Sequence, residues 1–552
     1  MTKQFSNYSD LLTFTRASKG HALRPVSYGS ELVTNGTFDT DSDWTKGTGW
    51  TISGGAAVSN NASGYGDVRQ GLSLTANKIY RLEFSVTSYT SGAVKPYLGN
   101  SGNSLAEPYG RGNLTASSTA DSAGDFYAFF VYDASQLSQI LFRSNNGFVG
   151  SIDNVSVKEV TFDQTDGTLT LFEHPDNVPR VEYDADRNRL GLLVEEARTN
   201  NLTYSNGFTE SIWTTDAGTT TANEATAPDR TNTAFSYTPD TTSARHRIRL
   251  LVGSANAGNV CASVFVKANG ASHAAFQVED KNTGRHTVVL NFSSASIVDT
   301  DNFGSPTVVD SGVSEIGNGW YRVHITLTQP ATGFFAMGIG TADSDSPTYL
   351  GGFTSHTGDG SSGIYVFGAQ LEAGSFPTSY IKSNSGSTTT RSADVASIPV
   401  ADFGYNHKEI TVMAEFIAPN WASSSTYHRV LSFDGKWGVF NDGSTASGTV
   451  RYRFDNDSNV AQFGAGNLDA ATYGTSETMS KVAFALKNND AAITKDGNAV
   501  GTDTSGDYDI ELRTTLTIGA ESASTNYLSG HLKTLKVYPR RLTNAQLQDL
   551  SS

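Results

Sequence analysis

Apolar and polar residues alternate with a period of two in many short runs of the chain. In residues 78–87, Tyr80, Leu82, Phe84 and Val86 fall on one side of such a run, and Arg81, Glu83, Ser85 and Thr87 fall on the other. This alternation predicts a strand with one buried face. The same pattern recurs in residues 321–328, 409–416 and 450–457. We therefore expect an all-β chain.

Turn and cap residues separate these runs. Asp496-Gly497 predicts a hairpin, because both central positions of its turn tolerate positive φ. The end of the chain predicts one short helix. Thr543 can cap its start together with Gln546, and Leu542 and Leu547 occupy the two positions of a hydrophobic staple.

Length and composition extend this picture to several domains. A chain of 552 residues is too long to fold around one hydrophobic core, and the usual domain size predicts three or four domains. Its 54 glycines and its low charged fraction of 17% suit short strands joined by tight turns.

One module opening occurs twice. Residues 31–44 (ELVTNGTFDTDSDW) align with residues 201–213 (NLTYSNGFTESIW), so that Leu32, Asn35, Gly36, Phe38 and Trp44 match Leu202, Asn206, Gly207, Phe208 and Trp213. Each opening leads into more than a hundred residues of strand pattern and closes on an apolar strand, a suitable length for one sandwich. When the first and last strands pair, both ends of a module lie together, and such a module can be inserted into another chain.

The first module interrupts other segments. Residues 11–25 and 168–200 look like parts of one framework, and TTTRSADVAS at Thr388, within residues 388–400, echoes TFTRAS at Thr13. We call these three ranges the framework segments. They either pack together as a connecting platform or are ordinary linkers. The expected divisions are 1–29 (anchor or framework), 30–158 (inserted jelly roll), 159–200 (framework), 201–382 (second jelly roll), 383–400 (linker or framework) and 401–552 (C-terminal sandwich).

The framework motifs resemble those of phage and prophage virion proteins. FTRAS at Phe14, NVPRVEY at Asn177, LLVEEARTN at Leu192, the opening at Asn201 and GAQLEAGSFPTSYI at Gly368 stand in that order. The resemblance is specific as a series, and it implies a fibre, spike or head-surface protein.

Two further parts resemble other families. Residues 30–158 resemble a jelly-roll carbohydrate-binding module, through NGTFD at Asn35 and IDNVSV at Ile152. Residues 401–552 resemble a concanavalin-A-like or laminin-G-like sandwich, through ITVMAEF at Ile410 and the closing LSGHLKTLKVYPRRLTNAQLQDL. The expected fold is all-β, with tandem antiparallel sandwiches, namely two jelly rolls and a concanavalin-A-like sandwich, and a short C-terminal helix.

No catalytic motif accompanies this fold. The sequence has no P-loop, HExxH or GxSxG motif, and a single cysteine, Cys261, which we expect to be buried. Glu195-Glu196 and Asp184/Asp186 suggest a glycosidase, but adjacent residues of a strand point to opposite faces. Salt links to Arg187, Arg189 or Arg198 are the better interpretation, and we expect no enzyme.

Charge and apolar runs limit the partners and the location. A net charge of -16 without basic clusters argues against binding nucleic acid. The first twenty residues lack a signal-peptide core, and no apolar run reaches the roughly 20 residues that span a bilayer. We expect no membrane insertion, assembly in the host cytoplasm, and a final location on the virion surface after lysis.

Aromatic side chains beside amides suit glycan recognition. Trp44, Trp213 and Trp320 recur at module positions and are expected in the cores, whereas Tyr97, Tyr109 and Trp421 lie among turn residues and are the candidate carbohydrate-binding residues.

A structural calcium ion is implied by the jelly-roll resemblance. Asp39 and Asp153 occupy the matching places, and oxygen ligands suit this ion. Uncomplexed aspartates in turns are the alternative, and no other cofactor is expected.

Together these observations predict a non-enzymatic virion structural protein that binds host-surface or environmental glycans. Other virion proteins of the capsid or tail are the further partners, and a homo-oligomer, a trimer by analogy, is expected. The alternatives are a decoration or stabilising protein that binds no sugar, and a polysaccharide-degrading tailspike.

Overall fold

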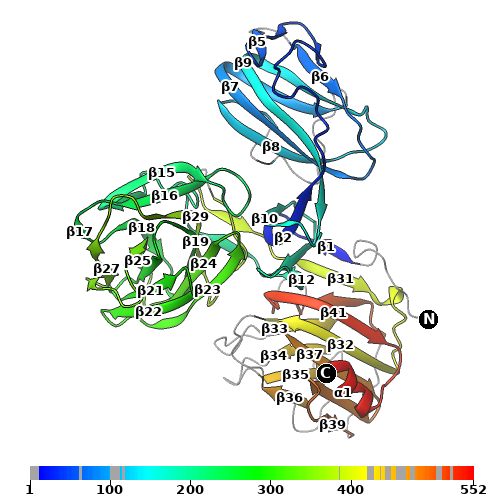
Figure 1. The fold of residues 1–552 in the computed structure, drawn as a ribbon. Coiled ribbons are helices and arrows are strands. Elements are labelled where there is room, and N and C mark those ends of the chain that lie inside the picture. The colour runs from blue at the N-terminus through cyan, green and yellow to red at the C-terminus, as the bar shows by residue number, and fades with distance from the viewer. Residues whose placement is uncertain are drawn as a thin grey trace. The chain divides into compact units, whose positions relative to one another are not determined.

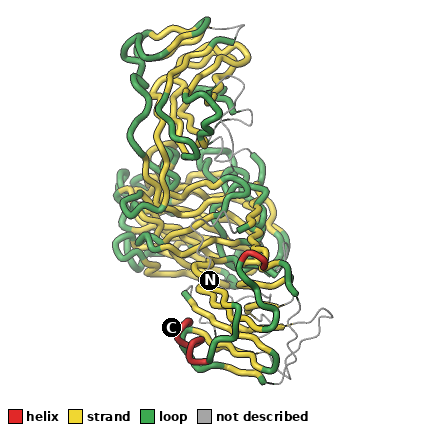
Figure 2. Tube along the Cα trace, turned by 90° about the vertical axis from the view of Figure 1, so that its right-hand side faces the viewer, coloured by secondary structure: helices red, strands yellow, loops and turns green. Residues whose placement is uncertain are grey.

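The computed structural model describes residues 12–60, 65–99, 112, 114, 118–383, 386–418, 428–435, 437–441, 449–454, 468–472, 479–504, 512–521 and 526–552. Strands dominate the described residues, and helix is confined there to short segments (Figure 2). Among the described residues, the α-helix is α1 (Asn544–Ser551), and a 3-10 turn spans Val400–Asp402. The prediction of an all-β chain of antiparallel sandwiches with a short C-terminal helix is confirmed.

The chain forms two compact units. The main unit comprises Met1–Arg24 and Leu169–Ser552, and the inserted unit is Pro25–Thr168. β2 (Gly20–Tyr28) leads into the inserted unit and β10 (Thr168–His174) leads out of it. The outgoing and returning chains pair, because Val26 lies opposite Phe162 and the Asp163 N–H donates to the Pro25 carbonyl at 2.9 Å. Both ends of the inserted unit are therefore adjacent.

The inserted unit is built on a long two-stranded ribbon. Its strands are β3 (Thr45–Lys46), β4 (Trp50–Ile52), β5 (Ala57–Asn60), β6 (Asp67–Gly71), β7 (Ile79–Leu98), β8 (Gly124–Val131) and β9 (Gln139–Phe162). β7 pairs with β9 over its whole length, from Ile79 opposite Val160 to Leu98 opposite Ile140 (Figure 1, blue to cyan). The predicted alternation is confirmed, since Tyr80, Leu82, Phe84 and Val86 are all buried.

The ribbon is irregular near its middle. The register shifts at four places between Glu83 and Ala93, which are bulges or irregularities that bend a strand. Gly92 has φ +73°, and a Cβ there would lie 2.4 Å from the backbone of Gly147, whose own φ is +74°. Only glycine fits such a close backbone crossing. The ribbon thereby encloses one hydrophobic core that contains Trp44, Trp50 and Phe142.

The second sandwich consists of two six-stranded antiparallel sheets (Figure 1, green). The first has the order β14 (Trp213–Asp216), β18 (Arg247–Ala255), β25 (Gly333–Ala342), β20 (His273–Glu279), β21 (Arg285–Asn291), β22 (Ser296–Phe303). The second has the order β15 (Gly218–Ala225), β16 (Ala234–Pro239), β29 (Gly363–Ala373), β19 (Gly258–Asn269), β24 (Trp320–Gln329), β23 (Val308–Gly317). Short pairs join β17 (Ser243–Ala244) to β28 (His356–Thr357) and β26 (Tyr349–Leu350) to β27 (Phe353–Thr354).

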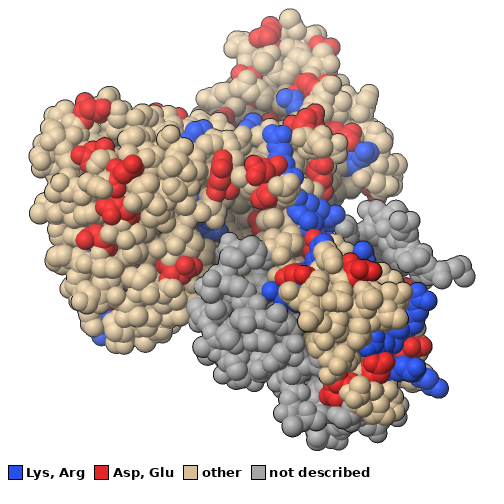
Figure 3. All heavy atoms as spheres, turned by 60° about the horizontal axis from the view of Figure 1, so that its bottom comes forward, with Lys and Arg blue, Asp and Glu red and all other residues tan. Residues whose placement is uncertain are grey.

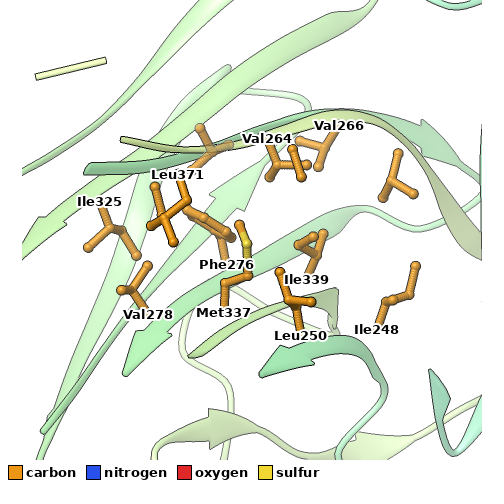
Figure 4. Close-up of a cluster of buried hydrophobic side chains, with 14 of the residues drawn as sticks. Ile248, Leu250, Val264, Val266, Phe276, Val278, Ile325, Met337, Ile339 and Leu371 are labelled. Carbon is orange, nitrogen blue, oxygen red and sulfur yellow. The ribbon is translucent and has the colours of Figure 1, made fainter. Parts of the chain in front are cut away.

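Apolar side chains from both sheets fill the space between them. Figure 4 shows Ile248, Leu250 and Ile339 from the first sheet facing Val264, Val266 and Leu371 from the second. Cys261 is fully buried, as expected. Close packing of such side chains is what stabilises the sandwich, at about 1.5–3 kcal/mol for each large apolar residue buried.

The two module openings adopt the same local structure. In the inserted unit, the rings of Phe38 and Trp44 lie 5.0 Å apart, and in the second sandwich those of Phe208 and Trp213 lie 4.7 Å apart. Each indole N–H donates to the backbone carbonyl nine residues earlier, that of Asn35 or of Tyr204. Trp44, Trp213 and Trp320 are all buried, so their predicted core role is confirmed.

The C-terminal sandwich is completed by framework strands. One seven-stranded sheet has the order β1 (Thr13–Thr15), β31 (Val395–Pro399), β40 (Thr515–Ile518), β33 (His428–Phe433), β34 (Trp437–Asn441), β35 (Thr449–Phe454), β36 (Leu468–Thr472). The other has the order β11 (Arg180–Tyr183), β12 (Arg189–Val194), β41 (Gly530–Tyr538), β32 (Glu409–Ile417), β37 (Ser480–Lys487), β38 (Asp490–Lys495), β39 (Gly501–Asp503). Phe14 and Val194 belong to the same core as Ile410 and Phe433. Four strands of the framework segments, β1, β11, β12 and β31, are thus part of this sandwich, an arrangement that the sequence expectation of a separate platform did not contain.

The predicted C-terminal helix and the predicted hairpin turn are both confirmed. Thr543 caps α1 in a capping box with Gln546, and Leu542 and Leu547 are buried together. Asp496 and Gly497 both have positive φ in the turn between β38 and β39, as predicted for this hairpin.

Candidate functional site

Charged residues from the framework motifs meet in one buried cluster. The cluster contains Arg16, Arg180, Glu195, Arg391 and Asp394, each at most 4% exposed. We call these five residues the framework junction. They come from widely separated parts of the chain, and short strands position them: Arg16 follows β1, Arg180 begins β11 and Arg391 ends β30 (Thr389–Arg391), which pairs with β13 (Arg198–Asn200).

The junction is fully paired on its acidic side. Asp394 accepts from Arg16 Nη1 at 3.1 Å and from Arg180 Nη2 at 2.5 Å, and Glu195 accepts from Arg180 Nη2 at 2.8 Å. Arg391 Nη2 lies 3.5 Å from Glu195 Oε2. The hydroxyl and the N–H of Ser379 both donate to Glu195 at 2.7 Å. Three guanidinium groups thus share two carboxylates away from water.

This arrangement fixes the charge of Glu195. Burial disfavours the ionised carboxylate, but Arg391, Arg180 and the two Ser379 donors outweigh burial and hold the pKa of Glu195 well below its usual range. Burial and the neighbouring Arg180 lower the pKa of Arg16 to about 10. A carboxylate held ionised in this way is a poor general acid, because it has no proton to donate at ordinary pH.

Glu196 and Asp184, two other carboxylates that suggest a glycosidase, are also engaged. The Glu196 side chain pairs with Arg198, one of the partners expected from sequence, and the Glu196 carbonyl accepts from Arg391 Nη2 at 2.7 Å. Asp184 accepts from the N–H and the side-chain amide of Asn188, so it organises a turn. The salt links of Glu195 to Arg180 and Arg391 were not foreseen.

Tyr97 lies on the outer face of the ribbon in the inserted unit. It is half-buried near the end of β7, and its neighbours Pro96 and Leu98 are buried on the opposite face. Lys95 Nζ lies 5.3 Å from the centroid of the Tyr97 ring, and the guanidinium carbon of Arg143 lies 5.7 Å from it. Both distances are in the range of cation–π contacts.

Acidic and basic side chains continue this face across the sheet. Arg143 on β9 lies opposite both Lys95 on β7 and Asp67 on β6, and Asp67 lies 3.6 Å from Arg143 and 3.5 Å from Arg69. We call Lys95, Tyr97, Arg143, Asp67 and Arg69 the Tyr97 face. An aromatic ring held by cations, beside groups that donate and accept hydrogen bonds, can contact the apolar side of a sugar ring and its hydroxyls.

Sequence reasoning found part of this face. Lys95 could have been added to the prediction, because it stands two residues before Tyr97 and so shares its side of the strand. Arg143 and Asp67 gave no such signal, since only the sheet pairing brings them together. Tyr109 and Trp421, the other two candidate aromatic residues, lie outside the described residues.

Asp39 and Asp153, the expected calcium ligands, lie where the first and last segments of the inserted unit run side by side. The Val155 N–H donates to the Gly36 carbonyl at 2.9 Å, which places these segments side by side. Asp39 is exposed and accepts from the Thr37 hydroxyl, and Asp153 accepts from the Asn154 N–H. Within the described ranges no group of three or more His, Cys, Asp or Glu residues could hold a metal ion, and calcium at Asp39 and Asp153 stays a prediction.

The surface and the helices add two observations. Most of the described surface visible in Figure 3 is neither acidic nor basic. In the described part of the chain, no helix has the length and apolar character needed to cross a membrane.

Comparisons with known proteins give only distant matches. No protein-family model matches the chain, and no curated protein matches it. Among solved structures, the chain is similar to the tandem CBM22 modules of Xyn10C from Paenibacillus barcinonensis, with 10% identity over 63% of this chain and 98% of that one, and a TM-score of 0.20. It is also similar to domains LG4-5 of the mouse laminin α1 chain, with 13% identity over 55% and 92% and a TM-score of 0.17.

A third match is the Trypanosoma rangeli sialidase, with 9% identity over 96% of this chain and 93% of that one, and a TM-score of 0.21. At TM-scores near 0.2 the chains do not superimpose as wholes, so these likenesses carry no argument about ligand or activity. The assignment of the sandwiches rests on the sheets themselves.

Proposed function

We propose that this protein is a non-enzymatic structural component of a bacteriophage particle, exposed on its surface as a fibre, spike or head-surface protein, and that it binds host-surface or environmental glycans. In this role its sandwiches present binding faces, and its framework connects them to other virion proteins.

The framework junction supports the structural part of the proposal. Arg16, Arg180 and Glu195 stand in three of the motifs that resemble virion proteins, and Ser379 stands in a fourth. Arg180, Glu195 and Ser379 are joined by buried ion pairs and hydrogen bonds, and Asp394 links Arg16 to Arg180. Residues of this kind hold strands together, which supports a structural role for this part of the motif series.

The Tyr97 face carries the glycan-binding part of the proposal. Its ring contacts Lys95 and Arg143 on the outer, partly exposed side of a sheet. This geometry suits stacking on a pyranose, with the flanking charged groups as hydrogen-bond partners.

Substituting Tyr97 tests glycan binding. The full-length protein is screened on a glycan array, and the variant Tyr97→Ala is compared with it by biolayer interferometry on the glycans that bind. We expect a loss of roughly tenfold in affinity, the size of one aromatic contact. Tyr65→Ala is the matched control, because Tyr65 is an exposed tyrosine of the same unit at 72% exposure. Equal binding by the wild type and Tyr97→Ala would exclude this face.

The virion role has its own test. Electron microscopy of intact particles, with an antibody against the inserted unit, should place the protein on the particle surface. A surface location without any glycan binding would favour a decoration or stabilising protein. Release of reducing ends from host polysaccharide would instead establish a tailspike enzyme.

A further inference from the structure

The first sheet of the second sandwich carries on its outer face a row of side chains with exposed apolar residues at its ends and charged residues toward its middle. The pairing places Leu251 opposite Ala336, Ala336 opposite Glu279, Glu279 opposite Arg285, and Arg285 opposite Phe303. The row thus crosses β18, β25, β20, β21 and β22. With strands about 4.8 Å apart, its ends are separated by about 19 Å. Leu250, Met337 and Val278, the neighbours of these residues along the strands, point into the core.

A buried carboxylate organises the middle of this row. Glu279 is only 5% exposed and accepts from Arg285, whose Nη2 lies 3.1 Å from Oε1 and whose Nε lies 3.0 Å from Oε2. This two-point contact satisfies both carboxylate oxygens. Arg285 Nη1 also donates to the Gly351 carbonyl at 2.7 Å. The charges of Glu279 and Arg285 are therefore already matched.

Arg249 is a second cation at the same carboxylate. Its Nη2 lies 3.6 Å from Glu279 Oε2, beyond hydrogen-bond distance, and its side chain is 30% exposed. Within the described residues, this ion pair is the sole polar contact recorded for the Arg249 guanidinium. Since a guanidinium has five N–H donors, Arg249 can offer several of them to a ligand in solution.

Exposed apolar side chains flank the charged group. Leu251 is 53% exposed at one end of the row, Phe303 is 46% exposed at the other, and Leu350 is 56% exposed in the β26–β27 hairpin next to Gly351. Arg285 lies 5.2 Å from the centroid of the Phe303 ring, so one side of that ring is covered and held in place. Large apolar side chains that gather at one exposed place commonly mark a binding surface.

The β26–β27 hairpin borders the row on the same face of the sheet. The Gly352 carbonyl accepts from the side chains of Gln277 and Thr287, both at 2.5 Å, and Phe353 packs against Arg247 at 5.2 Å. The hairpin thereby covers the part of the sheet beside the row and leaves Leu251, Arg249 and Phe303 accessible. The accessible surface is an elongated strip whose side chains are held in place by the sheet and the hairpin.

We propose that this strip is a second saccharide site, separate from the Tyr97 face, which binds an extended acidic oligosaccharide. A carboxylate or sulfate of the sugar binds Arg249, and a pyranose ring stacks on the free side of Phe303. The row from Leu251 on β18 to Phe303 on β22 is about 19 Å long, which exceeds one pyranose ring, so a ligand that follows the whole strip has several residues. This inference rests on the proposed glycan-binding function and gives the chain two sugar sites, which would raise avidity on a polymer.

We expect direct contact with Arg249, and not long-range attraction, to determine the affinity for an acidic saccharide. The whole chain carries a net charge of -16, which opposes a polyanion at long range. An effect of a single arginine on the binding of acidic glycans therefore reports a direct contact.

The test measures binding of the full-length protein to three immobilised polymers: polygalacturonate, which carries carboxylates, sulfated dextran, and neutral dextran. The variants are Arg249→Gln and Phe303→Ala. Arg230→Gln is the matched control, because it removes the same charge from an exposed position of the same sandwich. We expect Arg249→Gln to weaken binding to at least one polyanion tenfold or more, Phe303→Ala to weaken it several-fold, and Arg230→Gln to change it less than twofold. The polyanion that loses affinity identifies the carboxylate or the sulfate as the anion bound.

Three outcomes would overturn the inference: binding of neither polyanion by the wild type, unchanged binding of both by Arg249→Gln and Phe303→Ala, or an equal loss on neutral dextran. The Tyr97→Ala variant separates this inference from the proposed function. If neutral glycans bind in a Tyr97-dependent manner while polyanions do not bind, the second site is wrong and the proposed function stands. If the wild type binds no glycan at all, both are wrong.

Discussion

Two adjacent glutamates illustrate how position decides the role of a residue. Glu195 is buried among Arg180, Arg391 and Ser379, whereas the Glu196 side chain is partly exposed and pairs with Arg198. Both side chains have the same chemistry and nearly the same place in the sequence. The difference in energy comes from burial, because removing one partner of a buried ion pair leaves an uncompensated charge away from water.

We predict that Glu195→Gln destabilises the main unit by about 3 to 5 kcal/mol at neutral pH, since Arg180 and Arg391 lose their shared negative partner. Glu196→Gln, the matched control, should cost less than about 1 kcal/mol. Chemical denaturation of both variants measures the difference. Equal stabilities would mean that the junction contributes nothing to folding.

The same substitution should change the acid limb of the stability profile. The pKa of Glu195 is lower in the folded chain than the value of about 4.3 in an unfolded one, so its stabilisation is present above that value. It is lost as the pH falls toward the folded pKa. Glu195→Gln should therefore lose less stability than the wild type between about pH 5 and pH 2.

The residue scale also shows what the sequence could predict. The burial of Tyr80 and Leu82 followed from alternation, because a strand fixes the side of each residue locally. The pairing of Arg16 with Asp394 joins positions 378 residues apart, and no local pattern encodes such a contact. The aromatic character of Tyr97 was visible, but its cationic neighbours came only from the sheet register.

At the scale of elements, the β7–β9 ribbon depends on a few backbone positions. Alternation predicted strands here, but it did not predict that one strand would run for 20 residues with shifts in register. The shifts between Tyr89 and Ala93 coincide with the close approach of Gly92 to the backbone of Gly147, where a side chain has no room.

We predict that Gly92→Ala destabilises the inserted unit by about 1 to 3 kcal/mol, because alanine must adopt φ +73° and its Cβ would meet the backbone of Gly147 and Phe148. Gly71→Ala is the control, since a Cβ at Gly71 meets nothing within 4 Å. Hydrogen exchange followed by mass spectrometry should show faster exchange in β7 and β9 for Gly92→Ala alone. The same protection in both variants would contradict this account of the ribbon.

At the scale of the whole molecule, the main unit is interrupted but does not depend on the interruption. Each unit has its own core, and the chain enters and leaves the inserted unit through paired strands. The Asp163 N–H donates to the Pro25 carbonyl. If only two residues stood between Pro25 and Asp163, the same hydrogen bond would close a β-turn.

We predict that replacing residues 26–162 by Asn-Gly leaves the main unit folded. Pro25 and Asp163 would then flank a two-residue turn with residues suited to it. The shortened chain should unfold cooperatively, and Glu195→Gln should destabilise it as much as it destabilises the full chain. Loss of cooperative unfolding on excision would show that the main unit requires the inserted one.

The pairing of β1 with β31 also has a consequence in time. Phe14 lies opposite Ala396 in the sheet, and Arg16 contacts Asp394 at a separation of 378 residues. A ribosome adds about 5 to 20 residues per second, so Arg16 waits roughly 20 to 80 s for its partner. During that interval the inserted unit, whose contacts are complete by Thr168, can fold on the nascent chain. β1 is therefore synthesised first but is among the last strands to enter a sheet. Along the chain, the folded inserted unit lies between β1 and its partner β31.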